Sequence, residues 1–281
     1  MSSYPKMLWE DRARALLASP EPDRCRTEHS ITAFFPAYND ATTIGGLVEF
    51  TDAVLARVTP DYEIVVVNDA SPDDLANVLA ELCDRFPRLK VVTHLRNRGY
   101  GGALQSGFAH ATKELIFYTD GDGQYDPTEI VSLLPHIDGA DLVNGYKIRR
   151  ADALYRVVIG RLYHWTAKLL FGLKVRDVDC DFRLVRRSLI QRISLVSMKG
   201  SICCEMIKKL QMAGCRIVEV PVHHYPRVSG RSQFFQFSKV ALSLAMLLRL
   251  WGDIVLAPAL RPLRARLPFH RRVPVDAPRA K

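Results

Sequence analysis

The sequence lacks the features that mark several protein classes. Its apolar segment at 240–248 ends at Arg249, short of the roughly 18 apolar residues that a membrane-spanning helix needs. The six cysteines show neither a Cys-x-x-Cys pair nor metal-finger spacing, which argues against a zinc module. A G-x-G-x-x-G loop is absent because position 104 is leucine, and this argues against a dinucleotide-binding dehydrogenase.

A secretory signal pattern is missing as well. Glu10, Asp11, Arg12 and Arg14 interrupt the short apolar runs near the start of the sequence. We therefore expect a cytoplasmic protein whose cysteines are reduced thiols.

Positive charge is concentrated from Arg249 onward, and the first 248 residues are nearly neutral. The formal net charge is +9, and from Arg249 onward eight basic side chains accompany two acidic ones. Only +3 therefore remains on the first 248 residues. Nucleic acid is not expected as a partner, because these residues show no interleaving of aromatic and basic side chains.

Short apolar segments alternate with segments of helical periodicity from residue 31 onward. Both faces of such strands are covered when helices flank a parallel sheet, which explains strands that are apolar throughout. The pattern predicts an α/β fold with a mainly parallel sheet and with its polar, glycine-rich segments at one edge. The predicted strands lie at 31–35, 63–67, 89–93, 114–117 and 141–146, and a long helix is predicted at 154–171.

The segment YTDGDGQYD at 118–126 follows the fourth predicted strand. Asp120 and Asp122 emerge where that strand ends, and the neighbouring glycines let the backbone bend until both carboxylates face one point. Converging carboxylates hold hard cations such as Mg²⁺ or Mn²⁺, whose remaining ligands are commonly substrate phosphates. Taken alone, such a segment is more often a simple turn. In this setting it predicts a divalent-metal site for a nucleoside diphosphate.

Four motifs, in this order and spacing, resemble the inverting glycosyltransferases of family 2. That family has the nucleotide-sugar-binding, Rossmann-like α/β fold called GT-A. The resemblance extends over about residues 30 to 233. The motifs are Pro36-x-Tyr38-Asn39, Asn68-Asp69-x-Ser71, Asn97-x-Gly99-x-Gly101-x-Ala103 and Asp120-Gly121-Asp122-Gly123-Gln124-x-Asp126-Pro127.

The resemblance implies a set of contacts to a nucleotide sugar and its metal. Asp120, Asp122 and Gln124 are the implied ligands of Mg²⁺ or Mn²⁺. Asp40 replaces the Glu of the family and Asn68 replaces an Asp, so the donor stays open between GDP-mannose and a UDP-sugar. The implied nucleotide-sugar contacts are Pro36, Tyr38, Asp40, Asp69, Arg98, Gly99, Asp120, Gln124, Arg183 and Ser232.

A second acidic segment places three carboxylates at alternate positions. If the segment is extended, Asp177, Asp179 and Asp181 share one face and repel one another, which calls for a cation or for sugar hydroxyls. The segment resembles the D-x-x-S-G-F-R motif of polyprenyl-phosphate glycosyltransferases, a subgroup that includes dolichol-phosphate mannose synthase. Asp177 and Arg183 match that motif, whereas Cys180 and Asp181 replace its Ser and Gly.

A third motif, Arg227-x-x-Gly230-x-Ser232, resembles the loop of the same subgroup that closes over the diphosphate and the acceptor. The resemblance implies that Arg227 neutralises the charge that develops on the leaving phosphate. His223 and His224 precede this motif, and we interpret them as loop or packing residues.

These segments suggest an extension at 1–27, a catalytic domain at 28–232, an amphipathic helical segment at 233–265 and a basic tail at 266–281. An amphipathic helix and a basic tail are two weak signals that together hold a protein on anionic lipid. We expect peripheral association with the inner face of a membrane. The alternative is a helix that packs on the catalytic domain or in a dimer, and the oligomeric state stays open.

The combined prediction is a metal-dependent glycosyltransferase. It would move mannose or glucose, with inversion, from a nucleoside-diphosphate sugar to a polyprenyl phosphate. Two alternatives stay open: a family 2 enzyme with a hydroxyl acceptor, which needs a general base, and a nucleotide-sugar-binding module without turnover. The candidate catalytic residues are Asp122, Asp177, Asp179, Asp181 and Arg227.

Overall fold

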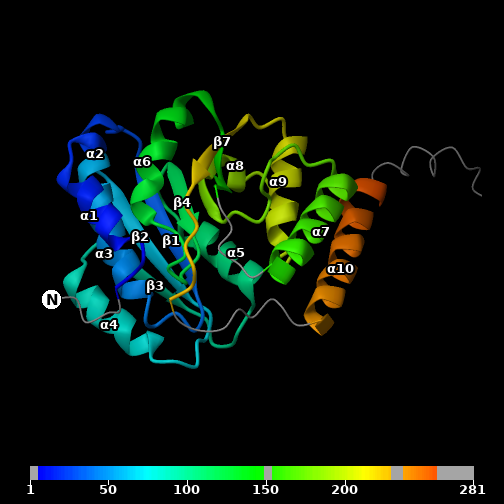
Figure 1. Cartoon of the computed structure of the whole chain (residues 1–281), viewed down its shortest axis with the longest axis horizontal. Helices are drawn as coiled ribbons and strands as arrows, with labels where there is room; N and C mark the ends of the chain where they lie inside the picture. The colour runs from blue at the N-terminus through cyan, green and yellow to red at the C-terminus, as the bar shows by residue number, and fades with distance from the viewer. Residues whose placement is uncertain (1–5, 149–153, 229–236, 258–281) are drawn as a thin grey trace, which may run out of the picture.

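The computed structural model describes residues 6–148, 154–228 and 237–257, which form a seven-stranded sheet with helices on both faces (Figure 1). The strand order is β3-β2-β1-β4-β6-β5-β7. The strands are Ile31–Ala37 (β1), Tyr62–Asn68 (β2), Leu89–Thr93 (β3), Leu115–Thr119 (β4), Leu142–Lys147 (β5), Phe182–Arg186 (β6) and Ile217–Val222 (β7).

The mainly parallel sheet expected from the sequence is confirmed. Strands β1 to β4 run parallel, and β5 runs parallel to β7. Strand β6 is the exception, because it runs antiparallel to its neighbours β4 and β5. The sequence analysis did not identify β6 or β7, since Arg183 and Arg186 in one and Glu219 and Pro221 in the other interrupt the apolar pattern.

Two apolar cores lie on the two faces of the sheet. Neighbouring side chains of a strand point to opposite faces, so Phe35 packs in the core beneath α1, α3, α4 and α6, whereas Phe34 packs in the core beneath α5, α7, α9 and α10. The helices are Glu10–Ala18 (α1), Glu21–Arg24 (α2), Ile44–Val58 (α3), Leu75–Arg85 (α4), Tyr100–His110 (α5), Ile130–Leu133 (α6), Leu154–Phe171 (α7), Arg187–Ile190 (α8), Ile202–Met212 (α9) and Phe237–Trp251 (α10).

The polar segments that follow β1, β2 and β4 meet at one edge of the sheet. Because these strands are parallel, their carboxyl ends lie together. Backbone hydrogen bonds join the segments: Asp69 N donates to Ala37 O over 3.1 Å, and Gly121 N donates to Pro36 O over 3.2 Å. This edge therefore carries the motifs that the sequence analysis singled out.

The segment before β1 packs into the first core. Met7, Trp9 and Ala13 are buried there, and the ring of Trp9 meets the ring of Phe50 edge-on, with 5.2 Å between centroids. Residues 6–18 are thus an integral layer over α3, although the sequence pattern suggested only an extension.

Helices α7 and α10 lie side by side on the opposite face (Figure 1). Ala167 and Phe171 of α7 share the second core with Leu247 and Leu250 of α10. In the described parts of the chain, none of the helices has the length and apolarity that crossing a bilayer requires.

A buried carboxylate ties the strands together at the edge opposite to the motifs. Glu63 of β2 accepts hydrogen bonds from Thr32 Oγ1 (2.6 Å) and Thr112 N (2.7 Å), and Lys90 Nζ lies 2.6 Å from its second oxygen. Burial opposes ionisation, but the hydrogen bonds from Lys90, Thr32 and Thr112 outweigh it and lower the pKa of Glu63 to about 2.

Replacement of Glu63 by Gln should lower the free energy of unfolding at pH 7 by about 1 to 2 kcal/mol, a value that allows for solvent screening. Because the pKa of Glu63 is lower in the folded state, its contribution is complete above the unfolded pKa of about 4.5 and is lost as the pH falls towards 2. Urea unfolding of both proteins between pH 7 and pH 3 should show the difference shrink. Glu81→Gln, at an exposed position of α4, is the matched control. A difference that stays constant with pH would contradict this account.

Candidate active site

The acidic loop begins where β4 ends, and its backbone is tightly held. A Cβ atom on Gly121 would lie 2.7 Å from Pro36 O, so no side chain fits there. Gly123 has φ +72°, a left-handed conformation that suits glycine. The two glycines flank Asp122 and let the chain turn it back towards Asp120. The bend expected from the sequence is therefore present.

The carboxylates of this edge lie close to one another, with Asp122 and Asp181 buried and Asp120 partly buried. Burial and the negative charges of Asp181 and Asp122 raise the pKa of Asp120 well above its ordinary value. Burial also raises the pKa of Asp122, while the cations Arg227 and Lys147 oppose that shift. Such a cluster of oxygen ligands is stabilised by added positive charge.

Residues 223–228 approach the acidic loop directly. The Arg227 guanidinium donates to Asp122 Oδ2. Gln124 Nε2 donates to Tyr225 O over 2.9 Å, and Tyr225 N donates to Gln124 O over 2.8 Å. The structure therefore brings together Asp120, Asp122, Gln124 and Arg227, which the sequence assigns to one site. Ser232 lies outside the described residues.

His223 packs as the sequence analysis expects. Its backbone N donates to Glu129 Oε2 over 2.9 Å, and its ring nitrogen Nδ1 lies 2.6 Å from Glu129 Oε1. His224 meets the ring of Tyr125, with 5.0 Å between centroids. Both histidines contact the loop and core, which agrees with a packing role.

The residues assigned to the base and ribose line the same edge, but part of their bonding capacity goes to the protein. The Asp69 carboxylate accepts from Arg98 N (2.7 Å) and Gly99 N (2.8 Å). Asp40 accepts from Tyr38 N over 2.9 Å, and burial, together with the charge of Asp122, raises the pKa of Asp40 to about 7. Asp69 thus organises the segment at 97–99.

The glycines at the start of α5 are explained by packing. Gly101 N donates to Met198 O over 3.1 Å, and a Cβ atom on Gly101 would lie 2.2 Å from Ser197 O. The backbone of 197–198 therefore lies directly on this turn. The Arg98 guanidinium donates to Ser106 Oγ over 3.2 Å.

The expectation of an extended acidic segment with three carboxylates on one face is wrong. Residues 178–179 form a turn, and Asp179 N donates to Asp177 Oδ1 over 3.1 Å. Asp177 and Asp179 instead lie with His164 of α7, and one ligand atom from each falls within 4.8 Å of the others. Asp181 turns elsewhere. The turn forms because the side chain of Asp177 caps it, a local bond that competes with an extended backbone.

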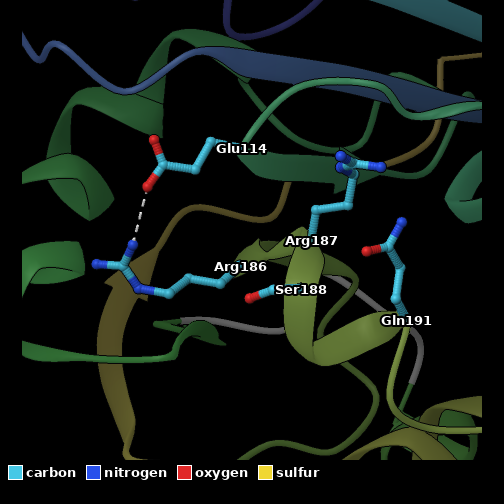
Figure 2. Close-up of a pocket in the computed structure, with 5 residues that line it drawn as sticks. All are labelled: Glu114, Arg186, Arg187, Ser188 and Gln191. Carbon is cyan, nitrogen blue, oxygen red and sulfur yellow. Dashed lines mark hydrogen bonds and ion pairs between the residues drawn. The ribbon is translucent and has the colours of Figure 1, made fainter.

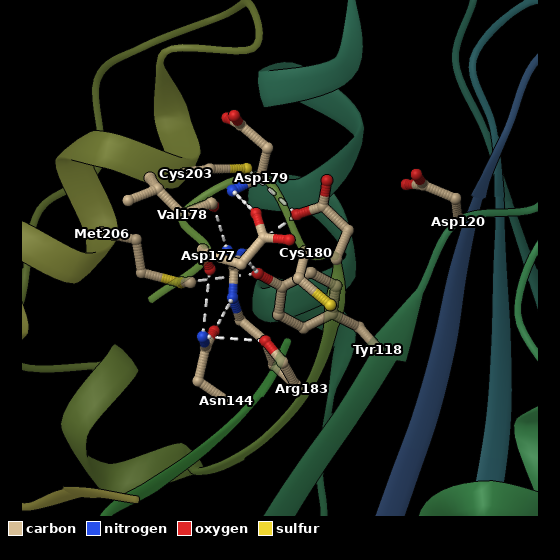
Figure 3. A network of polar contacts seen from close by, with 12 residues as sticks. Tyr118, Asp120, Asn144, Asp177, Val178, Asp179, Cys180, Arg183, Cys203 and Met206 are labelled. Carbon is tan, nitrogen blue, oxygen red and sulfur yellow. Dashed lines mark hydrogen bonds and ion pairs between the residues drawn. The ribbon is translucent and has the colours of Figure 1, made fainter. Parts of the chain in front are cut away.

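Arg183 lies at the centre of a buried network with Tyr118 and Asn144 (Figure 3), and Asp181 belongs to the same network. Arg183 is fully buried, and its guanidinium donates to Asn144 Oδ1 (2.7 Å), Asp181 Oδ1 (3.0 Å) and the hydroxyl oxygen of Tyr118. Cys203 Sγ donates to the same Asp181 oxygen over 3.1 Å. Asp181 and Arg183 are therefore each other's charge partners behind the site.

Two residues of the site were missed by sequence reasoning. The Tyr100 hydroxyl donates to Asp120 Oδ1 over 2.8 Å, and Lys147 lies close enough to oppose the raised pKa of both Asp120 and Asp122. Lys147 directly follows the strand predicted at 141–146, and this position at a strand end could have indicated a site residue. Nothing in the local sequence distinguishes Tyr100 from a glycine-loop residue that points outward.

A surface hollow lies at the opposite edge of the sheet (Figure 2). Arg186, which lines it, pairs with Leu115 at the start of β4, far along the strand from the acidic loop. Arg186 Nη1 also bonds Glu114 Oε1 over 3.1 Å. The hollow is therefore separate from the candidate active site.

Comparison with known proteins assigns the family. The model of "Glycosyl transferase family 2" matches residues 32–194, more than half of the chain. The chain belongs to glycosyl transferase family 2. The family assignment from sequence motifs is confirmed, and the protein is a glycosyltransferase enzyme.

Curated relatives of this glycosyltransferase include undecaprenyl-phosphate 4-deoxy-4-formamido-L-arabinose transferases. The protein from Klebsiella pneumoniae (strain ATCC 700721) is 30% identical over 237 residues, which cover 83% of this chain and 69% of the relative. The protein from Enterobacter sp. (strain 638) is 29% identical over 239 residues, with 84% and 69% covered.

Solved structures agree on the GT-A fold. Glucosyl-3-phosphoglycerate synthase from Mycobacterium tuberculosis, with phosphoglyceric acid, has a TM-score of 0.65 at 16% identity and covers 82% of this chain and 83% of its own. The same enzyme with Mn²⁺, uridine diphosphate and phosphoglyceric acid has a TM-score of 0.64 at 17% identity, with 82% and 81% covered.

Replacement of Arg183 by Met should lower the free energy of unfolding by about 3 to 5 kcal/mol, because it leaves the buried Asp181 charge without its partner. Arg186→Met, three residues along β6 and at a partly exposed ion pair, should cost about 1 kcal/mol or less. Urea unfolding at pH 7 measures both. Equal costs for the two variants would contradict the role given to the network.

Proposed function

We propose that this glycosyltransferase transfers a sugar from a nucleoside-diphosphate sugar to a polyprenyl phosphate, with inversion at the anomeric carbon. The observation that carries the proposal is the contact of Arg227 with Asp122 at the carboxylate cluster of Asp120 and Asp122. A site with paired acids and a guanidinium suits a metal–diphosphate group. The acceptors named for the relatives in Klebsiella and Enterobacter support the polyprenyl phosphate.

The residues of the acidic loop fit Mg²⁺ or Mn²⁺. Asp120 and Asp122 offer hard carboxylate oxygens whose pKa values are raised by burial and by neighbouring negative charge, which a cation would offset. The amide nitrogen of Gln124 is bound to Tyr225, so its amide oxygen is the atom that would act as a ligand. When bound, the ion stabilises the charge of the departing diphosphate. The Mn²⁺ complex of the Mycobacterium neighbour supports a divalent ion.

The chain's own residues would orient the reaction. The acceptor phosphate oxygen would attack the anomeric carbon in line while the bond to the diphosphate breaks, which inverts that carbon. Arg227 would then move from Asp122 to the leaving diphosphate. An anionic phosphate needs little deprotonation, so Asp177 and Asp179 would hold sugar hydroxyls.

A membrane surface is the proposed setting, because α7 and α10 expose apolar side chains. Leu162, Trp165 and Leu169 recur along one face of α7 and are 70%, 64% and 85% exposed. Leu244 and Leu248 of α10 are 43% and 48% exposed. An interfacial helix pair of this kind would place a lipid acceptor near the site. The inner face of the membrane stays our prediction for its location.

An alternative acceptor is a hydroxyl compound. It is favoured by the cluster of His164, Asp177 and Asp179, because a hydroxyl nucleophile needs a general base. In that case Asp179→Asn would abolish transfer while nucleotide binding persists. A binding module without turnover would instead tolerate substitution of Asp122.

The decisive assay incubates the protein with Mn²⁺, a panel of radiolabelled sugar nucleotides and polyprenyl phosphate, and then extracts the lipid. One donor should label the organic phase, and EDTA should remove the signal.

Asp122→Asn should lower the rate of transfer in this assay at least about 100-fold, because it removes a charge from the ion site. Asp138→Asn, which alters an exposed side chain at the opposite edge, should leave the rate unchanged. Donor consumption without labelled lipid would favour the hydroxyl acceptor.

Binding to lipid vesicles tests the apolar face of α7. The double variant Trp165→Asp/Leu169→Asp should lower the fraction that sediments with anionic vesicles at least about 10-fold, because two apolar side chains no longer enter the lipid. Leu95→Asp makes the same change at a fully exposed position outside α7 and should bind like the unmodified protein. Equal sedimentation of all three would contradict the proposed setting.

A further inference from the structure

We propose that residues 6–18 are a positioning element of the active site, in which Trp9 and Arg12 hold the acidic loop and the Arg227 segment in place. The inference rests on the proposed function, since it assigns a role toward the diphosphate and its ion. Trp9 is fully buried and bonds the backbone of the acidic loop, so its proposed role is that of a positioning residue.

Trp9 reaches the acidic loop through a buried hydrogen bond. Its indole Nε1 donates to Gly123 O over 2.8 Å, although the two residues are 114 positions apart. Trp9 is fully buried, so this bond is shielded from water. Met7 also packs against Gly123, since a Cβ atom added to that glycine would lie 2.9 Å from Met7 Sδ. The segment thus covers the back of the loop.

Asp122 is held by the backbone on both sides. The carbonyl of Gly121 accepts from Thr43 Oγ1 over 2.7 Å, and the carbonyl of Gly123 accepts from Trp9. Both donors come from elements outside the loop. These two hydrogen bonds hold the backbone on either side of Asp122, whose carboxylate itself accepts from Gln124 N over 3.1 Å and from Arg227.

Arg12 makes a second connection, to the segment that carries Arg227. Its guanidinium bonds Glu129 Oε1, and Glu129 Oε2 accepts from His223 N over 2.9 Å. His223 follows β7 and lies four residues before Arg227. Residues 9–12 therefore contact the acidic loop through Trp9 and, through Arg12 and Glu129, the segment that carries Arg227.

Substitution of Trp9 by Phe tests the inference, because it retains most of the ring and removes the N–H donor. Calorimetry should compare Mn²⁺ binding in the presence of UDP or GDP for the full chain and the variant. We expect Trp9→Phe to weaken Mn²⁺ binding about 5- to 20-fold, as expected for loss of one buried hydrogen bond that orients a ligand. Affinity equal to that of the unmodified chain would overturn the inference.

Phe50→Leu separates positioning from packing. Phe50 meets the Trp9 ring but contacts no loop carbonyl, so this variant disturbs the same core and retains the donor. It should lower the melting temperature while leaving the Mn²⁺ affinity within twofold. If both variants lose affinity in proportion to their loss of melting temperature, Trp9 acts only through packing and the inference fails.

Arg12→Ala provides a test that does not depend on the buried core. The Arg12 side chain is about half exposed (48%) but its partner Glu129 is only 6% exposed, so the melting temperature of the variant is measured beside its affinity. The substitution should weaken binding of the Mn²⁺–nucleotide pair about 2- to 5-fold, and unchanged binding would remove Arg12 from the positioning element. If the unmodified chain fails to bind Mn²⁺ in the presence of UDP and also in the presence of GDP, the proposed function itself is overturned. Equal binding by the unmodified chain and all variants would instead overturn only the positioning role.

Discussion

The structure depends on the balance of charge among buried carboxylates at the carboxyl edge of the parallel strands. Burial and the negative charges of Asp181 and Asp122 raise the pKa of Asp120, and burial with the charge of Asp181 raises that of Asp122. A buried charge is tolerated only where cations or hydrogen-bond donors compensate it. Arg183 contacts Asp181 and Arg227 contacts Asp122. The elements around this edge therefore place an arginine beside each of these two acids.

This requirement explains why acids that are neighbours in the sequence have separate environments. Asp181 is paired with Arg183 inside the fold, and it therefore contributes to structure. Asp177 and Asp179 instead lie with His164 of the long helix α7. The reversed strand β6 separates them, because it begins at Phe182, with two residues between it and the turn, and buries Arg183 beside Asp181.

The two edges of the sheet have different tasks. At the edge opposite to the site, Glu63 gathers donors from neighbouring segments and is fully satisfied, so it stabilises the fold. At the edge that carries the acidic loop, Asp122 is bound to Arg227, which is partly exposed. The Asp122–Arg227 pair is therefore more exposed than the Asp181–Arg183 pair behind it.

The sequence by itself determined the α/β class, the family and the residues of the acidic loop, because apolar strands and the Asp120-x-Asp122 spacing are local signals. Only the tertiary structure decided which charges meet. The bond of Arg227 to Asp122 spans 105 positions and that of Trp9 to Gly123 spans 114, and no local pattern encodes such pairs. The acidic turn was misread for a related reason: an alternation of Asp residues predicts a strand, but a capping bond within the segment and the charge of Arg183 determined its shape.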